Sequence, residues 1–292
     1  MRGQPTLPGL HTFRINTSGI EIFAPAGNVT PVVATSEHPS PLSMGTPLLD
    51  EMLGGGLPCG YSLLIAGPSG SGKSILAAAF LAEGARCGEK GVIAAFEQRP
   101  THTRNRILAD LIASGSISLV DSRVPDLSID EVVQLLLREI RRIKATRVVI
   151  DSLSGFELAI APTFRADFRE SLARLVNTLT DSGVTVVMTS ELEDRYDDLR
   201  FSPYGTAFLT DAIIVQRYIE LDSRLRRVMA VVKVRASPHS DELREYSIDE
   251  TGICIGEMLT DQEGLLSGRP TKKGGFHPSP AGAGNSGTGV SS

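Results

Sequence analysis

The stretch Gly67-Pro68-Ser69-Gly70-Ser71-Gly72-Lys73-Ser74 decides the fold of this chain, because it matches the pattern G-x-x-x-x-G-K-[ST] at every fixed position. The largely apolar run 61–66 before it has the length of a strand. Residues 75–87 after it are rich in Ala and Leu and free of Pro, which predicts a helix. A strand that leads through a glycine-rich turn into a helix N-terminus points several backbone N–H groups at one spot, where they favour anions. The pattern therefore predicts a loop that binds the phosphates of a nucleoside triphosphate.

The polar residues of this loop have distinct expected tasks. The glycines leave out Cβ atoms that would block phosphate oxygens, and Lys73 would reach the β- and γ-phosphates. The hydroxyl of Ser74 would bind Mg²⁺. The expected phosphate contacts come from Gly67, Ser69, Gly70, Ser71, Gly72, Lys73 and Ser74.

Composition favours one large α/β domain with tails. The 292 residues are 41% hydrophobic, and a chain of this size can bury about three quarters of its unfolded surface. No apolar run approaches the roughly 20 residues that span a bilayer, and the N-terminus lacks the apolar block of a signal peptide. The net charge of −5 argues against a protein that coats nucleic acid. We expect a cytoplasmic protein with reduced cysteines that binds neither a membrane nor nucleic acid.

Strands and helices alternate along the chain. Apolar runs of strand length lie at 92–96, 117–120, 147–151 and 184–189, and helical segments are predicted at 48–53, 101–114, 129–143 and 164–182. This alternation predicts an α/β fold whose mostly parallel central sheet has helices on both faces. After Asp211 the pattern changes to strands and turns, at 212–219, 227–234, 245–248 and 252–255, which predicts an antiparallel C-terminal extension of the sheet.

The chain divides into four expected parts: a hairpin at 1–23, a linker at 24–42, the main domain at 43–267 and a disordered tail at 268–292. Residues 12–22 repeat the pattern of residues 245–255, a strand, a polar turn closed by Gly and a second alternating strand. The repeat is either a coincidence or the last piece of a preceding copy of the domain.

Three further positions extend the expected site. Asp151 ends an apolar strand downstream of the loop, where its carboxylate would hold Mg²⁺ through water. Glu97 ends another strand on the same edge, where it would orient the attacking water or, alternatively, cap the next helix. In Thr189-Ser190-Glu191, the hydroxyls would sense the γ-phosphate or cap a helix.

With these residues in place, the chain resembles the KaiC family of RecA-like P-loop ATPases over roughly residues 12–270. The marks of the resemblance are Leu49-Asp50-Glu51-Met52-Leu53-Gly54-Gly55-Gly56, Phe96-Glu97, Ile150-Asp151-Ser152-Leu153, Thr210-Asp211 and Lys233-Val234-Arg235-Ala236-Ser237-Pro238-His239. The last of these is similar to the family's K-x-R-x-S-x-H segment.

The resemblance implies ring-shaped hexamers that bind ATP between subunits. Lys233 and Arg235 would then reach the γ-phosphate on a neighbouring subunit, and His239 would belong to the same site. Since Lys233 and Arg235 are two positions apart, their side chains would share one face of a strand. The implied catalytic residues are Glu97, Lys73 and Arg235, and the cofactors are ATP and Mg²⁺.

Two departures from the family's pattern concern hydrolysis and self-phosphorylation. Gln98 stands where the family has a second glutamate, and Ala207-Phe208 stands at the usual phosphorylated Ser-Thr pair. Thr206 and Thr210 are the hydroxyls that remain nearby.

The leading hypothesis is a slow, ring-forming, regulatory Mg-ATPase with a regulatory protein partner and a possible Ser/Thr autokinase activity. Two alternatives stay open at this point. The first is a RecA/RadA-like recombination ATPase, against which the acidic charge counts. The second is an ATP-switched signalling module that hydrolyses poorly, which Gln98 motivates.

Overall fold

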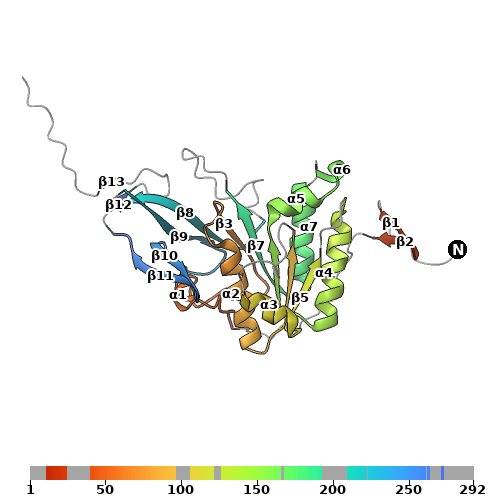
Figure 1. Cartoon of the computed structure of the whole chain (residues 1–292), viewed down its shortest axis with the longest axis horizontal. Helices are drawn as coiled ribbons and strands as arrows, with labels where there is room; N and C mark the ends of the chain where they lie inside the picture. Colours follow the sequence, from red (N-terminus) through yellow and green to blue (C-terminus); the bar gives the residue numbers. More distant parts are fainter. Residues whose placement is uncertain are drawn as a thin grey trace, which may run out of the picture.

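The computed structural model describes residues 11–24, 40–96, 106–121, 126–165, 168–192, 209–221, 223–260, 262–263 and 271–272. Six strands form the parallel part of its main sheet: β3 (Ser62–Gly67), β4 (Gly91–Ala95), β5 (Ile117–Asp121), β6 (Arg147–Asp151), β7 (Thr185–Glu191) and β8 (Ala212–Leu221). Three strands extend it in antiparallel fashion: β9 (Arg224–Val234), β10 (Leu243–Asp249) and β11 (Gly252–Met258). The order across the sheet is β11-β10-β9-β8-β3-β7-β6-β4-β5 (Figure 1). The predicted mostly parallel sheet with an antiparallel extension is confirmed. Residues 212–219 were expected in that extension but lie in β8, which is parallel to β3.

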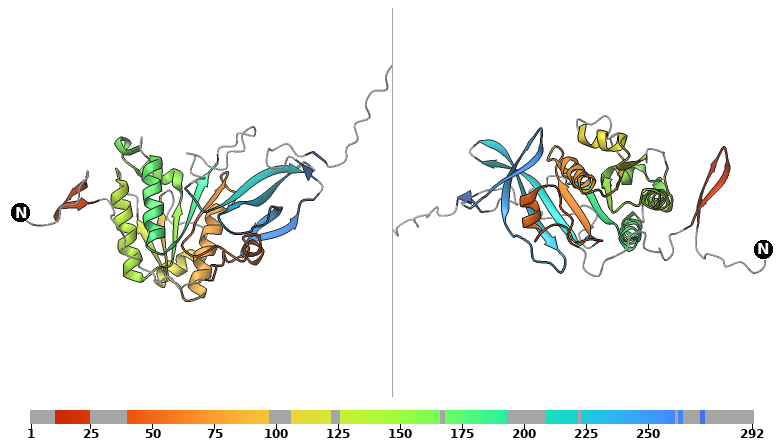
Figure 2. Two further views of the ribbon diagram at one scale, coloured as in Figure 1. Left: turned by 180° about the vertical axis from the view of Figure 1, so that it is seen from behind. Right: turned by 90° about the horizontal axis from the view of Figure 1, so that it is seen from below.

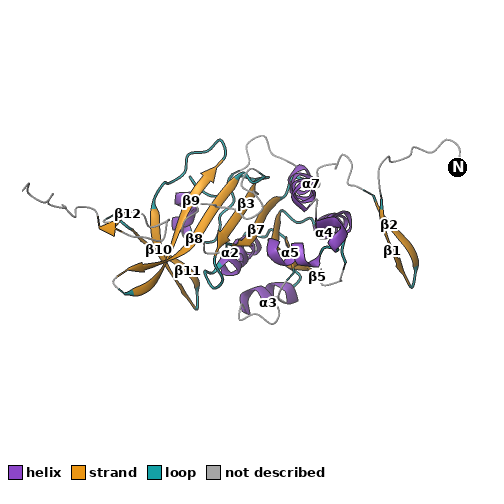
Figure 3. Cartoon of the chain, turned by 90° about the horizontal axis from the view of Figure 1, so that it is seen from above, coloured by secondary structure: helices purple, strands orange, loops and turns teal. Residues whose placement is uncertain are grey.

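Helices cover both faces of the parallel part. On one face lie α1 (Pro47–Met52), α2 (Lys73–Arg86) and α3 (Arg106–Ala113), and on the other α4 (Ile129–Ile143), α5 (Leu153–Ala159) and α7 (Phe168–Asp181). In Figure 3, α2 and α7 lie on opposite sides of the sheet. Alternate residues of each strand point to alternate faces, so the sheet has a separate buried apolar core on each side. No helix of the described part is long and apolar enough to cross a membrane.

Some elements differ from the sequence-based expectation. The predicted helix 164–182 corresponds to two helices, α6 (Pro162–Arg165) and α7, and the predicted helix 101–114 is described only from residue 106. The helix α5 was not predicted. It begins because Ser152 caps it, with the Ser152 hydroxyl accepting a hydrogen bond from the backbone N–H of Gly155 at 3.2 Å. Two residues of the expected tail form the strand β13 (Thr271–Lys272), which pairs with β12 (Gln262–Glu263).

The N-terminal hairpin consists of β1 (Thr12–Asn16) and β2 (Gly19–Phe23), and its turn is built like that of β10–β11. The Asn16 carboxamide oxygen accepts a hydrogen bond from the backbone N–H of Ser18 at 2.9 Å. In the second hairpin, the Asp249 carboxylate accepts the N–H of Thr251 at 2.7 Å. The glycines that follow have φ values of +122° and +125°. The sequence repeat is therefore also a repeat of turn geometry.

The hairpin β1–β2 lies beside α4, beyond the end of the main sheet (Figure 2). Arg14 forms a two-pronged ion pair with Glu131 of α4, at 2.7 and 2.9 Å. The side chain of Gln134 donates to the carbonyl of Ala24 at 2.9 Å. The opposite face of the hairpin carries four exposed apolar side chains, Phe13, Ile15, Ile20 and Ile22.

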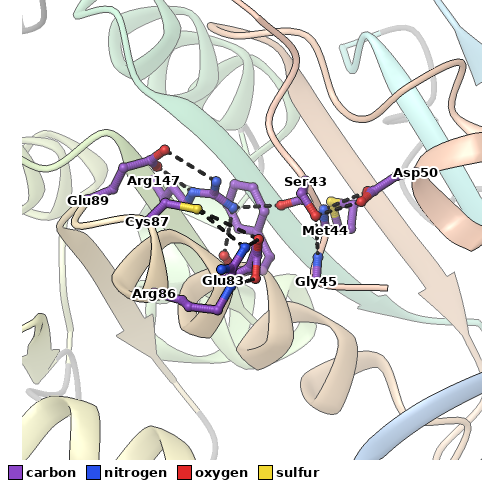
Figure 4. Close-up of polar contacts among 10 residues, drawn as sticks. Ser43, Met44, Gly45, Asp50, Glu83, Arg86, Cys87, Glu89 and Arg147 are labelled. Atoms are coloured by element: carbon purple, nitrogen blue, oxygen red, sulfur yellow. Dashed lines mark hydrogen bonds and ion pairs between the residues drawn. The ribbon is translucent and has the colours of Figure 1, made fainter. Parts of the chain in front are cut away.

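A buried arginine joins four segments at the edge of the sheet where the parallel strands begin (Figure 4). Arg147, at the start of β6, is 2% exposed, and its Nε donates to Glu89 Oε2 at 2.6 Å. Its Nη1 donates to the carbonyls of Ser43 and Phe80 at 2.7 and 2.8 Å. Gly84 of α2 packs against Arg147. A larger residue would not fit there, because a Cβ atom on Gly84 would lie 2.5 Å from Arg147 Cδ.

Replacing Arg147 with alanine is expected to lower the free energy of unfolding by about 3–5 kcal/mol, because it leaves a partly buried carboxylate and two carbonyls without their donor. Urea unfolding monitored by circular dichroism measures this change. Arg138→Ala is the control, since Arg138 pairs with Glu21 at 3.2 Å on the surface, and an exposed pair contributes at most about 1 kcal/mol. Equal changes in the two variants would contradict a structural role for Arg147.

Candidate functional site

The predicted phosphate loop joins the end of β3 to the start of α2. Its first part is a turn, in which the backbone N–H of Ser71 donates to the carbonyl of Pro68 at 3.3 Å. Gly70 has a φ of +77° and Gly72 a φ of +98°, a region that glycine adopts without a steric penalty. Gly72 is also the N-cap residue of α2, which begins at Lys73. The sequence pattern is thus matched by the backbone geometry it requires.

Groups with full or partial positive charge lie together at this loop. The first N–H groups of a helix have no acceptor within it, and the dipole of α2 adds a partial positive charge at the same place. The ammonium of Lys73 donates to the carbonyls of Gly67 and Pro68 at 2.9 and 2.8 Å, so it lies against the loop. The next residue, Ser74, is exposed at the first turn of α2. The arrangement suits a polyanion.

The side chains of Ser69 and Ser71, inside the loop, differ in orientation. Ser69 is exposed, whereas Ser71 has no exposed surface and its hydroxyl donates to Gln216 Oε1 at 3.0 Å. The Ser71 side chain therefore faces the protein interior. Only the backbone of Ser71 is left to face a ligand at the loop.

Asp151 and Thr189 lie side by side at the edge of the sheet where the parallel strands end. Asp151 is the last residue of β6, and its carboxylate accepts a hydrogen bond from the Thr189 hydroxyl. Both belong to the edge at which β3 leads into the phosphate loop, because β3, β7 and β6 are adjacent and parallel. Ser190 lies within β7, and its buried hydroxyl has no partner among the described residues.

Several predicted positions lie outside the described residues. These are Glu97 and Gln98 after β4, and Thr206, Ala207 and Phe208 before β8. Thr210 is described and is 1% exposed.

Lys233 and Arg235 belong to a different edge of the sheet. The guanidinium of Arg235 pairs with Asp211 at 3.1 Å and is more than half exposed. The ammonium of Lys233 donates to the carbonyl of Thr210, and burial together with the Arg235 charge lowers the pKa of Lys233 below its usual value. His239 follows as an exposed residue.

The separation of the two groups follows from the register of the strands. The backbone N–H of Asp211 donates to the carbonyl of Ser62 at 2.9 Å, so Arg235 lies near the start of β3. The hydroxyl of Tyr61 also donates to the Arg235 carbonyl at 3.2 Å. Since β3 rises about 3.3 Å per residue, its end at Gly67 is roughly 16 Å away. The structure therefore does not bring Lys233 and Arg235 to the phosphate loop of their own chain.

A family model described as "ATPase: KaiC" matches residues 42–260, which is most of the chain. The chain belongs to the KaiC ATPase family. The resemblance inferred from the sequence is confirmed for this range, and with it a P-loop ATPase fold of RecA-like type.

Curated KaiC proteins match nearly the whole chain. The circadian clock oscillator protein KaiC of Rippkaea orientalis is 31% identical over 278 residues, which cover 93% of this chain and 52% of the relative. The protein of the same name from Picosynechococcus is 30% identical over 93% of this chain and 53% of the relative. The chain thus spans about half the length of these curated relatives.

A solved structure of similar fold comes from an archaeon. The crystal structure of a KaiC-like protein from the hyperthermophile Pyrococcus horikoshii matches with a TM-score of 0.66 and 29% sequence identity. The match covers 74% of this chain and 99% of the archaeal chain. This chain therefore has a fold similar to that of a solved KaiC-like protein over about three quarters of its length.

Proposed function

We propose that this chain is a slow Mg-ATP hydrolase of KaiC type that forms a homo-oligomeric ring, with each nucleotide held between two subunits. One observation carries the proposal. The glycine-rich loop, with the Lys73 ammonium against it, lies where the parallel strands end, whereas Arg235 lies where they begin. A regulatory role in the cytoplasm, with a protein partner, is part of the proposal.

The residues of the loop fit a bound nucleoside triphosphate. Gly70 and Gly72 adopt the positive φ values that shape the loop, and the start of α2 supplies N–H donors. Mg²⁺ usually takes only one or two protein ligands and completes its shell with water and phosphate. Ser74 would be a direct ligand, and Asp151 would hold the ion through water.

Each of these residues would have one task. Bound Mg-ATP supplies the phosphoanhydride bond that is cleaved. Lys73 would neutralise phosphate charge, and Thr189 would hold the Asp151 carboxylate in one orientation through its hydrogen bond. Glu97 would accept a proton from the attacking water or orient it. Exposed Arg235 would stabilise the charge that develops on the phosphate of a neighbouring subunit.

Self-phosphorylation is a further part of this proposal. A hydroxyl acceptor must reach the γ-phosphate of a nucleotide, and Thr210 is buried between the start of β8 and its neighbours. Thr206 would then be the acceptor to test. We further propose that β1–β2 is the closing hairpin of a preceding copy of the domain, because its turn repeats that of β10–β11.

The shared site is tested by mixing two inactive variants. Arg235→Ala should hydrolyse ATP poorly on its own, and so should Glu97→Gln, which keeps its Arg235. In an equal mixture, about a quarter of the interfaces pair an intact Glu97 with an intact Arg235 on the next subunit, so phosphate release should recover to that extent.

Two controls make the mixing experiment decisive. Arg226→Ala removes an arginine of β9, paired with Glu245 at 2.9 Å, and should keep both ring size and hydrolysis. Light scattering after gel filtration, with and without ATP, measures ring formation. Absence of recovery in mixed rings whose co-assembly is shown by pull-down would place both residues in the site of one subunit.

A further inference from the structure

The phosphate loop rests on side chains from the antiparallel extension of the sheet. Tyr246 of β10 is 3% exposed, and its hydroxyl donates to the backbone carbonyl of Ser71 at 2.5 Å. Ile248 lies two residues further along β10 and packs against Gly72. A Cβ atom added to Gly72 would be only 2.7 Å from Ile248 Cδ1. The strand β10 therefore contacts both residues of the Ser71–Gly72 peptide.

The geometry of that peptide links Tyr246 to the ligand side of the loop. In a planar trans peptide, the carbonyl and the following N–H point in opposite directions. The Ser71–Gly72 peptide is trans, and its carbonyl points inward to the buried Tyr246 hydroxyl. The N–H of Gly72 must then point outward, toward the side from which a phosphate would approach.

A second strand holds the same residue through its side chain. Gln216 of β8 has no exposed surface, and its Oε1 accepts the Ser71 hydroxyl at 3.0 Å. The Gln216 Nε2 is buried and has no acceptor among the described residues. Ser71 is thus fixed by its carbonyl and by its hydroxyl, from two strands that follow it by more than 140 residues.

We propose that Tyr246 is a positioning residue for phosphate binding, which holds the Ser71 carbonyl so that the Gly72 N–H stays directed at a bound phosphate. The inference rests on the proposed function. Burial raises the pKa of Tyr246 above its usual value, so the phenol keeps its proton and remains a donor. Without that donor, the buried Ser71 carbonyl gains by rotating toward another partner, and the Gly72 N–H rotates with it.

The variant Tyr246→Phe removes one oxygen atom and keeps the ring that fills the core. We expect ATP and inorganic tripolyphosphate both to bind about fivefold to tenfold more weakly, the usual weight of one hydrogen bond. Equilibrium titration with a fluorescent ATP analogue, and competition by tripolyphosphate, measure both affinities. Equal losses are expected because the Gly72 N–H would meet a phosphate and not the base.

Ser182→Ala is the matched control. Ser182 is fully buried, and its hydroxyl donates to the carbonyl of Leu179 at 2.6 Å, at the end of α7 and the opposite edge of the sheet. Both variants lose a buried hydroxyl donor to a backbone carbonyl, so their melting temperatures without nucleotide should fall alike. Only Tyr246→Phe should lose phosphate affinity.

The outcomes separate the inference from the proposed function. Failure of the parent chain to bind ATP would overturn the proposed function itself. If the parent binds ATP and Tyr246→Phe binds it equally well, or if Ser182→Ala loses as much affinity, the positioning role is wrong. A loss for ATP without one for tripolyphosphate would also overturn it.

A second measurement serves if Tyr246→Phe does not fold. In parent protein labelled with ¹⁵N-glycine, the amide resonance of Gly72 should move downfield when tripolyphosphate is added. No movement at saturating tripolyphosphate would overturn the inference, because the Gly72 N–H would then make no contact with phosphate.

Discussion

Lys73→Ala is expected to weaken ATP binding by at least about 100-fold, since hydrogen bonds to charged groups contribute roughly 1.5–3 kcal/mol each and Lys73 would form two of them. The structure places the ammonium within 2.9 Å of two carbonyls of the phosphate loop, so the same loop loses its cation in the variant. Isothermal titration with ATP measures the effect.

The matched control for this change is Lys144→Ala. Lys144 is an exposed lysine at the end of α4, with a φ of 55°, and takes no part in the proposed site. It should bind ATP like the parent chain. If Lys73→Ala bound ATP as tightly as Lys144→Ala, the assignment of the phosphate loop would be wrong.

Glu97→Gln is expected to bind ATP normally and to hydrolyse it roughly 10²–10⁴-fold more slowly, the usual weight of a positioned acid or base. The amide keeps the size of the side chain and some of its hydrogen bonds but cannot accept a proton. Single-turnover release of phosphate separates this effect from binding and assembly.

Glu191 provides the comparison for Glu97. It is an exposed carboxylate at the end of β7, beside the strand that leads into the phosphate loop. Glu191→Gln should keep the rate of the parent chain. A large loss in Glu191→Gln with none in Glu97→Gln would transfer the role of the base to Glu191.

The strands and the phosphate loop were predictable because their signals are local. Each parallel strand contains a short apolar run, and the loop is a contiguous motif in which Gly70 and Gly72 have positive φ values. The start of α4 was equally predictable, since Ser128 accepts the N–H of Glu131, as an N-cap residue does. The helix α5 carried only one such signal, Ser152, which directly follows the predicted strand 147–151.

The remaining features depend on contacts between distant parts of the chain. Tyr246 and Gln216 meet Ser71 across 175 and 145 residues, and nothing in the loop motif indicates which side chains lie beneath it. The burial of Arg147 could not be predicted either, because the pattern of hydrophobic residues places arginine at the surface. The inward direction of the Ser71 side chain likewise depends on β8 and β10.

The phosphate loop and Arg235 lie at opposite ends of the parallel strands of one sheet. This placement would make the ATPase activity depend on the concentration of the protein. On the proposed arrangement a solitary chain carries two half-sites and no complete one. Dilution below the dissociation constant of the contact would silence hydrolysis without any inhibitor, and specific activity would climb as copies accumulate. The rate of the reaction would thus report how much of the protein a cell contains.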